Sequence, residues 1–262
     1  MNQGMICCIR KDIKECMRTG KVILFAGMVL GIGVMIMGFT LVFSDIPEEL
    51  WAQLPGFNIE SLEELVSTMY PKMVRESVGI FSYYIGFFFS LVVILVIHAM
   101  LPKEEKNAKW ILPMEQGYSK TDFLMGKCIV YGSLAGGMVL IGYLAYYFLA
   151  CCCMEQNMPF SNALVCGIVH GLNLFFIVAY TMMFSMLLKN PVVSAVSMIA
   201  TIILVPDMTA YFSIGKILPT HLLRFVYDSS NSYGELFVPM LLNITFLVIL
   251  WILIARKEGM QE

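Results

Sequence analysis

Two histidines and one pair of adjacent glutamates come closest to a catalytic pattern in this sequence. His98 and His170 each lie within a hydrophobic run, and Glu104-Glu105 stands in a polar interval between two such runs. Membrane hydrolases need a metal constellation or a positioned acid and base, but the sequence has no HExxH pattern. We therefore expect no catalytic residue and no metal site. We interpret His170, near Asn173, as an interhelical hydrogen-bond partner, with substrate contact as the alternative.

Nucleotide and redox chemistry are not indicated either. The sequence has no Walker A motif, so we expect no ATP hydrolysis by this chain itself. None of the eight cysteines forms a CxxC pair, and most lie in or beside apolar runs. We interpret them as small hydrophobic side chains in reduced or lipid surroundings, and we expect no cofactor bound by this chain.

The composition predicts a membrane protein in which helices position these residues. Hydrophobic residues make up 59% of the chain and charged residues only 14%, whereas a soluble domain carries roughly 25% charged residues. A helix needs about 20 apolar residues to cross a bilayer. We therefore predict an all-α polytopic fold in a single transmembrane domain over 1–262, and no nucleic-acid binding. Its six expected spans are Val22–Phe43, Val78–Met100, Cys128–Cys151, Ala163–Leu188, Val192–Val205 and Leu236–Ala255.

Lysine and arginine gather on one side of the expected spans. Segments rich in these residues stay cytoplasmic, so we place both termini and the interval 101–127 in the cytoplasm. The basic residues on this side are Arg10, Lys11, Lys14, Arg18, Lys21, Lys103, Lys106, Lys109, Lys120, Lys127, Lys189, Arg256 and Lys257. The other side holds Lys72, Arg75, Lys216 and Arg224.

Two segments outside the spans have helical apolar patterns. Between residues 6 and 17, the residues Ile6, Ile9, Ile13 and Met17 define one helical face, and the basic residues Arg10, Lys11, Lys14 and Arg18 belong to the same segment. This pattern predicts an amphipathic helix in the cytoplasmic interface, and a simple basic flank of the first span is the alternative. The partly apolar segment 212–231 predicts a re-entrant hairpin at the outer face, before the last span.

Small and aromatic residues mark faces of the expected spans. Glycines repeat at four-residue spacing in three of them, which allows helices to approach closely; the pairs are Gly27/Gly31, Gly132/Gly136 and Gly167/Gly171. An aromatic run in the second span includes Tyr83, Tyr84, Phe87 and Phe88. We interpret these rings as packing residues, and a path for amphipathic cargo, with His170, is the alternative.

The interval from Leu101 to Lys127 resembles the cytoplasmic loop between the second and third spans of ABC-2 type transporter permeases. The segments that carry the resemblance are Glu104-Glu105-Lys106, Trp110-Ile111-Leu112, Gly117-Tyr118-Ser119-Lys120 and Phe123-Leu124-Met125-Gly126-Lys127. The N-terminal segment 9–18 is also similar to the amphipathic helix that precedes the first span in that family. The chain departs from the pattern at Gly117, where proline is usual, at Lys120, where arginine is usual, and at Asn107-Ala108, where Gly-Thr is common.

The resemblance implies a transport subunit, not an enzyme, driven by a separate ATPase that binds ATP and Mg²⁺. It also implies a second permease chain, identical or related, in a bacterial plasma membrane, and an amphipathic or hydrophobic substrate such as an antimicrobial peptide, drug or lipid. A cytoplasmic coupling helix would contact the ATPase, through Glu104, Glu105, Lys106, Lys109, Trp110 and Leu112, with the two glutamates capping the helix start. The alternatives are a non-transporting membrane partner or regulator and, as the weakest, a membrane enzyme. The Glu104-Glu105 pair is similar to that of CAAX-protease-like enzymes, but Lys109 replaces their arginine and no suitable histidine follows.

Overall fold

The computed structural model describes residues 3–45, 79–106, 120–153, 160–188, 190–209, 222 and 234–259. In this part of the chain the secondary structure is helical and no strand occurs. The α-helices are α1 (Gln3–Arg18), α2 (Lys21–Asp45), α5 (Ser90–Lys106), α7 (Lys120–Cys153), α8 (Phe160–Leu187), α9 (Pro191–Thr209) and α10 (Gly234–Gly259). A π-helical segment, η1 (Ile85–Phe89), directly precedes α5.

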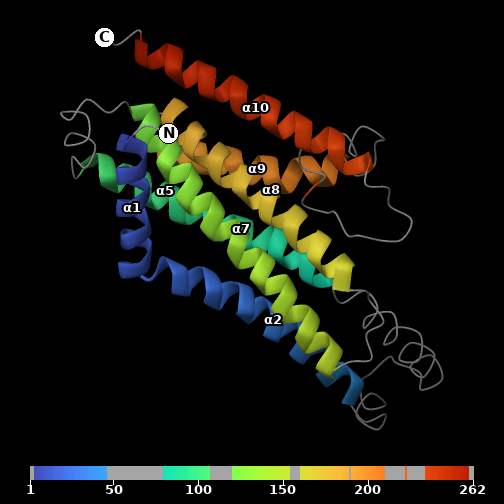
Figure 1. Ribbon diagram of the computed structural model, residues 1–262. Helices are drawn as coiled ribbons and strands as arrows, with labels where there is room; N and C mark the ends of the chain where they lie inside the picture. Colours follow the sequence, from blue (N-terminus) through green and yellow to red (C-terminus); the bar gives the residue numbers. More distant parts are fainter. Residues whose placement is uncertain are drawn as a thin grey trace.

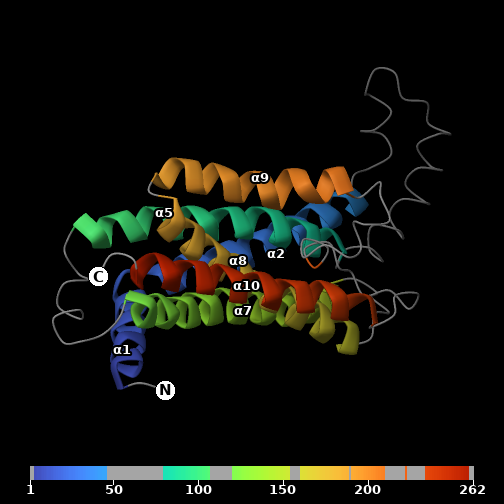
Figure 2. The same ribbon diagram turned by 90° about the horizontal axis from the view of Figure 1, so that it is seen from above.

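The long helices form a bundle, and α1 crosses one end of it. Figures 1 and 2 show α2, α5, α7, α8, α9 and α10 running along the bundle, whereas α1 stands at a steep angle to them in both views. The N- and C-terminal ends lie at the same end of the bundle as α1 (Figures 1 and 2). The side of the membrane on which the two termini lie stays a prediction.

Five of the helical segments are long and apolar enough to cross a membrane: Lys21–Phe39, Gly79–Pro102, Asp122–Cys153, Ala163–Leu187 and Leu236–Ile254. They correspond to five of the six predicted spans and fit a multi-pass membrane protein. The remaining predicted span falls on α9, in which the apolar part Pro191–Ile202 is shorter. The predicted re-entrant segment 212–231 lies outside the described residues, apart from Leu222.

Helices α7 and α8 form the centre of the bundle through contacts between glycines. A Cβ atom added at Gly136 would lie 2.6 Å from the carbonyl oxygen of Gly171, and one added at Gly171 would lie 2.8 Å from that of Gly136. Neighbouring positions are equally tight, because a Cβ at Gly132 would meet the ring of Phe175 at 2.5 Å. The spacing of these glycines therefore predicted the close helix contact correctly. Nothing lies within 4 Å of such an atom at Gly27, however, so that glycine pair has no partner helix among the described residues.

Polar side chains connect α8 and α5 to the outer helices. The Nδ1 atom of His98 lies 2.9 Å from the carbonyl of Ile94, and its Nε2 lies 2.9 Å from the hydroxyl of Ser194 on α9. Because a carbonyl only accepts, Nδ1 carries the proton and Nε2 accepts from Ser194. On the other side of the bundle, the hydroxyl of Tyr180 on α8 contacts the backbone carbonyl of Asn243 on α10 at 2.9 Å. Interhelical bonds of this kind hold packed helices in register inside a membrane.

Candidate functional site

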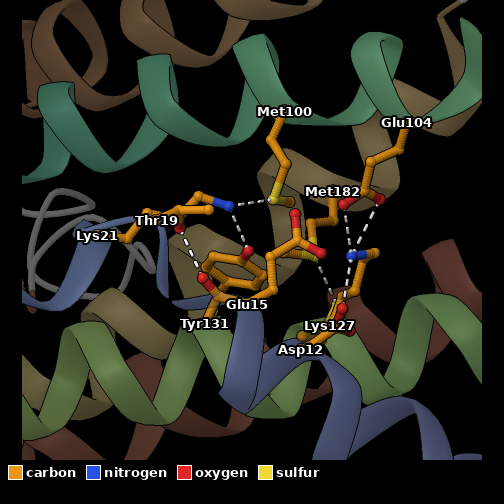
Figure 3. Close-up of polar contacts among 10 residues, drawn as sticks. Asp12, Glu15, Thr19, Lys21, Met100, Glu104, Lys127, Tyr131 and Met182 are labelled. Carbon is orange, nitrogen blue, oxygen red and sulfur yellow. Dashed lines mark hydrogen bonds and ion pairs between the residues drawn. The ribbon is translucent and has the colours of Figure 1, made fainter. Parts of the chain in front are cut away.

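Three charged side chains from three helices meet at the end of the bundle that α1 crosses. The ammonium nitrogen of Lys127, on α7, lies 3.0 Å from both carboxylate oxygens of Glu104 on α5 and 3.1 Å from Oδ1 of Asp12 on α1 (Figure 3). The side chains of Lys127 and Asp12 are fully buried, and that of Glu104 is 3% exposed. We call these three residues the ion triad. It joins α1, α5 and α7 through one ammonium group.

Aromatic faces and a second lysine extend the ion triad. The Lys127 ammonium lies 4.7 Å from the ring centroid of Phe123, at a distance suited to a cation–π contact. One turn further along α7, the hydroxyl of Tyr131 accepts a hydrogen bond of 2.6 Å from Lys21, the first residue of α2 (Figure 3). Two carboxylates are thus gathered with two ammonium groups, so the four-helix junction is balanced in charge.

The local sequence explains why α1 can reach the ion triad. A Cβ atom at Gly126 would lie 3.3 Å from Cβ of Cys8, so this glycine lets α1 approach α7 closely just before Lys127. Gly20 separates α1 from α2 and has φ +71°, a conformation that side chains with a Cβ rarely adopt. This turn directs α1 across the bundle and places Asp12 against α7.

The side of α1 that faces α7 differs from the apolar face predicted by the sequence. Its buried residues are Cys8, Asp12 and Cys16, which follow each other one turn apart. Of the four predicted apolar residues, Ile6 and Ile9 are half-buried, and Ile9 packs against the core, whereas Ile13 and Met17 are exposed. Burial raises the pKa of the Cys8 and Cys16 thiols, so both remain protonated near neutral pH. These three buried residues therefore supply packing and one charge to the contact with α7. Neither cysteine is present as a reactive thiolate near neutral pH.

The structure describes three of the six predicted coupling residues, Glu104, Glu105 and Lys106. Glu104 is placed in the last turn of α5, where it is buried and ion-paired, so it does not cap the start of a helix. Glu105 and Lys106 are also within α5. Lys109, Trp110 and Leu112, together with the predicted coupling helix, lie outside the described residues.

The basic residues of the predicted interfacial helix all belong to α1 and are exposed; they are Arg10, Lys11, Lys14 and Arg18. The nitrogen of Lys11 lies 5.4 Å from the ring centroid of Phe123 on α7. The prediction of a helix over residues 6–17 is confirmed. Its interfacial position remains a prediction, because it depends on a membrane.

The aromatic residues proposed for a substrate path gather on the surface, and His170 does not join them. The rings of Tyr83 and Phe87 stack at 6.4 Å, and those of Tyr84 and Phe88 stack at 5.7 Å. Tyr83 is 56% exposed and Phe88 is 42% exposed. The π-helical segment η1 contains both phenylalanines, and such segments change which side chains share a helix face. His170 is buried, 5.5 Å from the ring of Tyr143, whose hydroxyl donates to Ser82.

The sequence pattern did not predict that Asp12, Lys21 and Tyr131 are members of the junction. It assigned Lys127 to a polar interval, whereas α7 begins at Lys120 and carries Lys127 into the packed bundle. The sequence did contain a pattern that could have indicated the burial of Asp12. This residue lies between two small apolar cysteines at helical spacing, on the side of α1 opposite to its basic residues. The pairing itself depends on the angle between α1 and α7.

Chemically, the ion triad can fix α1, α5 and α7 to one another through buried charge. Among the residues that the structure describes, no group of three or more His, Cys, Asp or Glu side chains could hold a metal ion. Comparisons with protein families, with curated proteins and with solved structures found no match to this chain.

Proposed function

We propose that this chain is the permease subunit of an ATP-driven ABC exporter, in which a separate subunit binds and hydrolyses ATP. The observation that carries the proposal is the 3.0 Å contact between Lys127 and Glu104. This contact joins α5 and α7, the two helices that flank residues 107–119. The same lysine binds Asp12, so the amphipathic helix α1 belongs to the same unit.

A rigid base of this kind suits the transmission of movement from a cytoplasmic partner. Packed helices shift as bodies, because a close-packed interior does not deform continuously. A push on the interval 107–119 would therefore tilt α5 and α7 together. Both helices contact α8, so the tilt would reach the centre of the bundle. The stacked rings of Tyr83, Tyr84, Phe87 and Phe88, of which Tyr83 and Phe88 are exposed, suit an amphipathic or hydrophobic cargo, such as an antimicrobial peptide, a drug or a lipid.

The test is isolation of the chain from its native membrane, followed by a search for an attached ATPase subunit. We expect such a subunit to co-purify and its ATP hydrolysis to respond to the permease. The variants Lys109→Glu and Trp110→Ala should weaken this association without unfolding the bundle. Arg256→Gln removes an exposed base of α10 at the same end of the bundle, and it should leave the association unchanged.

Two results would overturn the proposal. One is the absence of any ATPase subunit from the purified complex, together with unchanged export in the Trp110→Ala variant. The other is an attached ATPase whose hydrolysis changes no accessibility at the outer face. This second result would favour a non-transporting membrane partner, the alternative drawn from the sequence.

A further inference from the structure

Two adjacent rows of exposed side chains run along α1. One row is basic and contains Arg10, Lys14 and Arg18, which follow each other at four-residue intervals. The other row is apolar and contains Ile13, which is 50% exposed, and Met17, which is 68% exposed. Because residues four apart lie on one helix face, each row forms a continuous strip.

The ion triad determines the sign of this surface. Helix α1 contains two acids, Asp12 and Glu15. Asp12 is fully buried and bound by Lys127, and Glu15 is half-buried. The fully exposed charges of α1 are therefore all positive. This property follows from the tertiary structure, because the sequence of the helix alone mixes both signs.

The position of α1 relative to the spans decides what this surface meets. α1 crosses the end of a bundle of membrane-spanning helices and is followed directly by the span Lys21–Phe39 (Figures 1 and 2). With the bundle in a bilayer, a helix at this angle would lie along the membrane surface, with its apolar strip at the acyl boundary and its basic strip among the headgroups. An acidic protein surface would complement the bases but leave the apolar strip without an equivalent partner.

We propose that the exposed face of α1 is a binding surface for anionic phospholipid headgroups. Lys14, Arg10 and Arg18 contact the phosphates, and Ile13 and Met17 enter the acyl boundary. Each basic side chain near an anionic membrane surface adds about fivefold to the association. The surface does not depend on the proposed transport function, since it would act in any membrane protein with this junction.

Hydrogen exchange of the full chain in lipid nanodiscs tests the proposal. One set of discs contains phosphatidylcholine alone, and the other contains phosphatidylcholine mixed with phosphatidylglycerol. We expect phosphatidylglycerol to slow amide exchange in α1, and high salt to reduce this effect. The single variant Lys14→Gln should lower the effect about fivefold, and the variant R10Q/K14Q/R18Q about a hundredfold. Exchange in α7 reports in each case that the bundle is folded.

Matched controls separate charge from other changes. R10K/K14R/R18K keeps three positive charges and should retain the lipid effect. Arg256→Gln removes a base from α10 and should leave exchange in α1 unchanged. The proposal is overturned if the two kinds of disc protect α1 equally, or if the effect persists in R10Q/K14Q/R18Q. It is also overturned if inorganic phosphate, added to phosphatidylcholine discs, protects α1 to the same extent as phosphatidylglycerol does, because the site would then bind a free anion.

Discussion

Replacing Lys127 by methionine should open the junction between α1, α5 and α7. Methionine keeps the length and most of the volume of the side chain but removes its charge. The change leaves the carboxylates of Asp12 and Glu104 buried without their ammonium partner. Breaking a buried ion pair in this way costs about 3–5 kcal/mol, because the remaining charge loses both water and its partner. We expect a loss of this size in the free energy that holds α1 against the bundle.

The assay is hydrogen exchange of the α1 amides in nanodiscs of phosphatidylcholine alone, with thermal unfolding in detergent as a second measurement. A loss of 3–5 kcal/mol would raise the opening equilibrium of α1 roughly a hundred- to a thousandfold or more. The matched control is Lys14→Met, which removes an exposed lysine from α1. Exposed substitutions usually change stability by about 0.5 kcal/mol or less.

A charge-free variant makes the physical reason testable. In Asp12→Asn/Glu104→Gln/Lys127→Met no buried ion remains, so most of the lost stability should return, because neutral replacements of buried ion pairs are often tolerated. The reasoning is refuted if Lys127→Met behaves like Lys14→Met. It is equally refuted if the charge-free variant is less stable than Lys127→Met, since the cost would then come from packing and not from unpaired charge.

Three further predictions concern packing and thiol chemistry. Gly136→Ala should destabilise the chain by about 1–3 kcal/mol in thermal unfolding, because its Cβ would lie 2.6 Å from a carbonyl oxygen of α8. The control is Gly137→Ala, whose added Cβ would have no neighbouring atom within 4 Å; this variant should be neutral or slightly stabilising. At pH 7.5, iodoacetamide should modify the exposed Cys7 well before the buried Cys16, whose raised pKa keeps the thiol protonated, and equal rates of modification would contradict the placement of α1. Tyr180→Phe should cost about 1 kcal/mol and loosen α10, seen as faster exchange of its amides, because the bond to α10 is lost; unchanged exchange would show that this bond does not hold α10.

The sequence by itself determined the class of protein and most of its helices. Long apolar runs must be helical in a bilayer, because no water satisfies their backbone groups there. Five of the six predicted spans correspond to helices long enough to cross a membrane. The remaining predicted span, Val192–Val205, corresponds to the shorter apolar part of α9. The pairs Gly132/Gly136 and Gly167/Gly171 also indicated faces that allow close approach, but the equally spaced pair Gly27/Gly31 has no described atom within 4 Å of an added Cβ, so spacing alone did not identify the partner.

Only the tertiary structure decided which polar residues belong together. Lys127 lies 115 residues from Asp12 and 23 residues from Glu104 along the chain, and the contact of all three depends on the angle of α1 after Gly20. Periodicity predicted that one side of α1 is apolar, but packing against α7 buried Cys8, Asp12 and Cys16, because Asp12 pairs with Lys127 and Cys8 lies against Gly126. The sequence thus specified the helices through local pattern. Contacts between distant segments decided which side of a helix such as α1 is buried and which of its charges stay exposed.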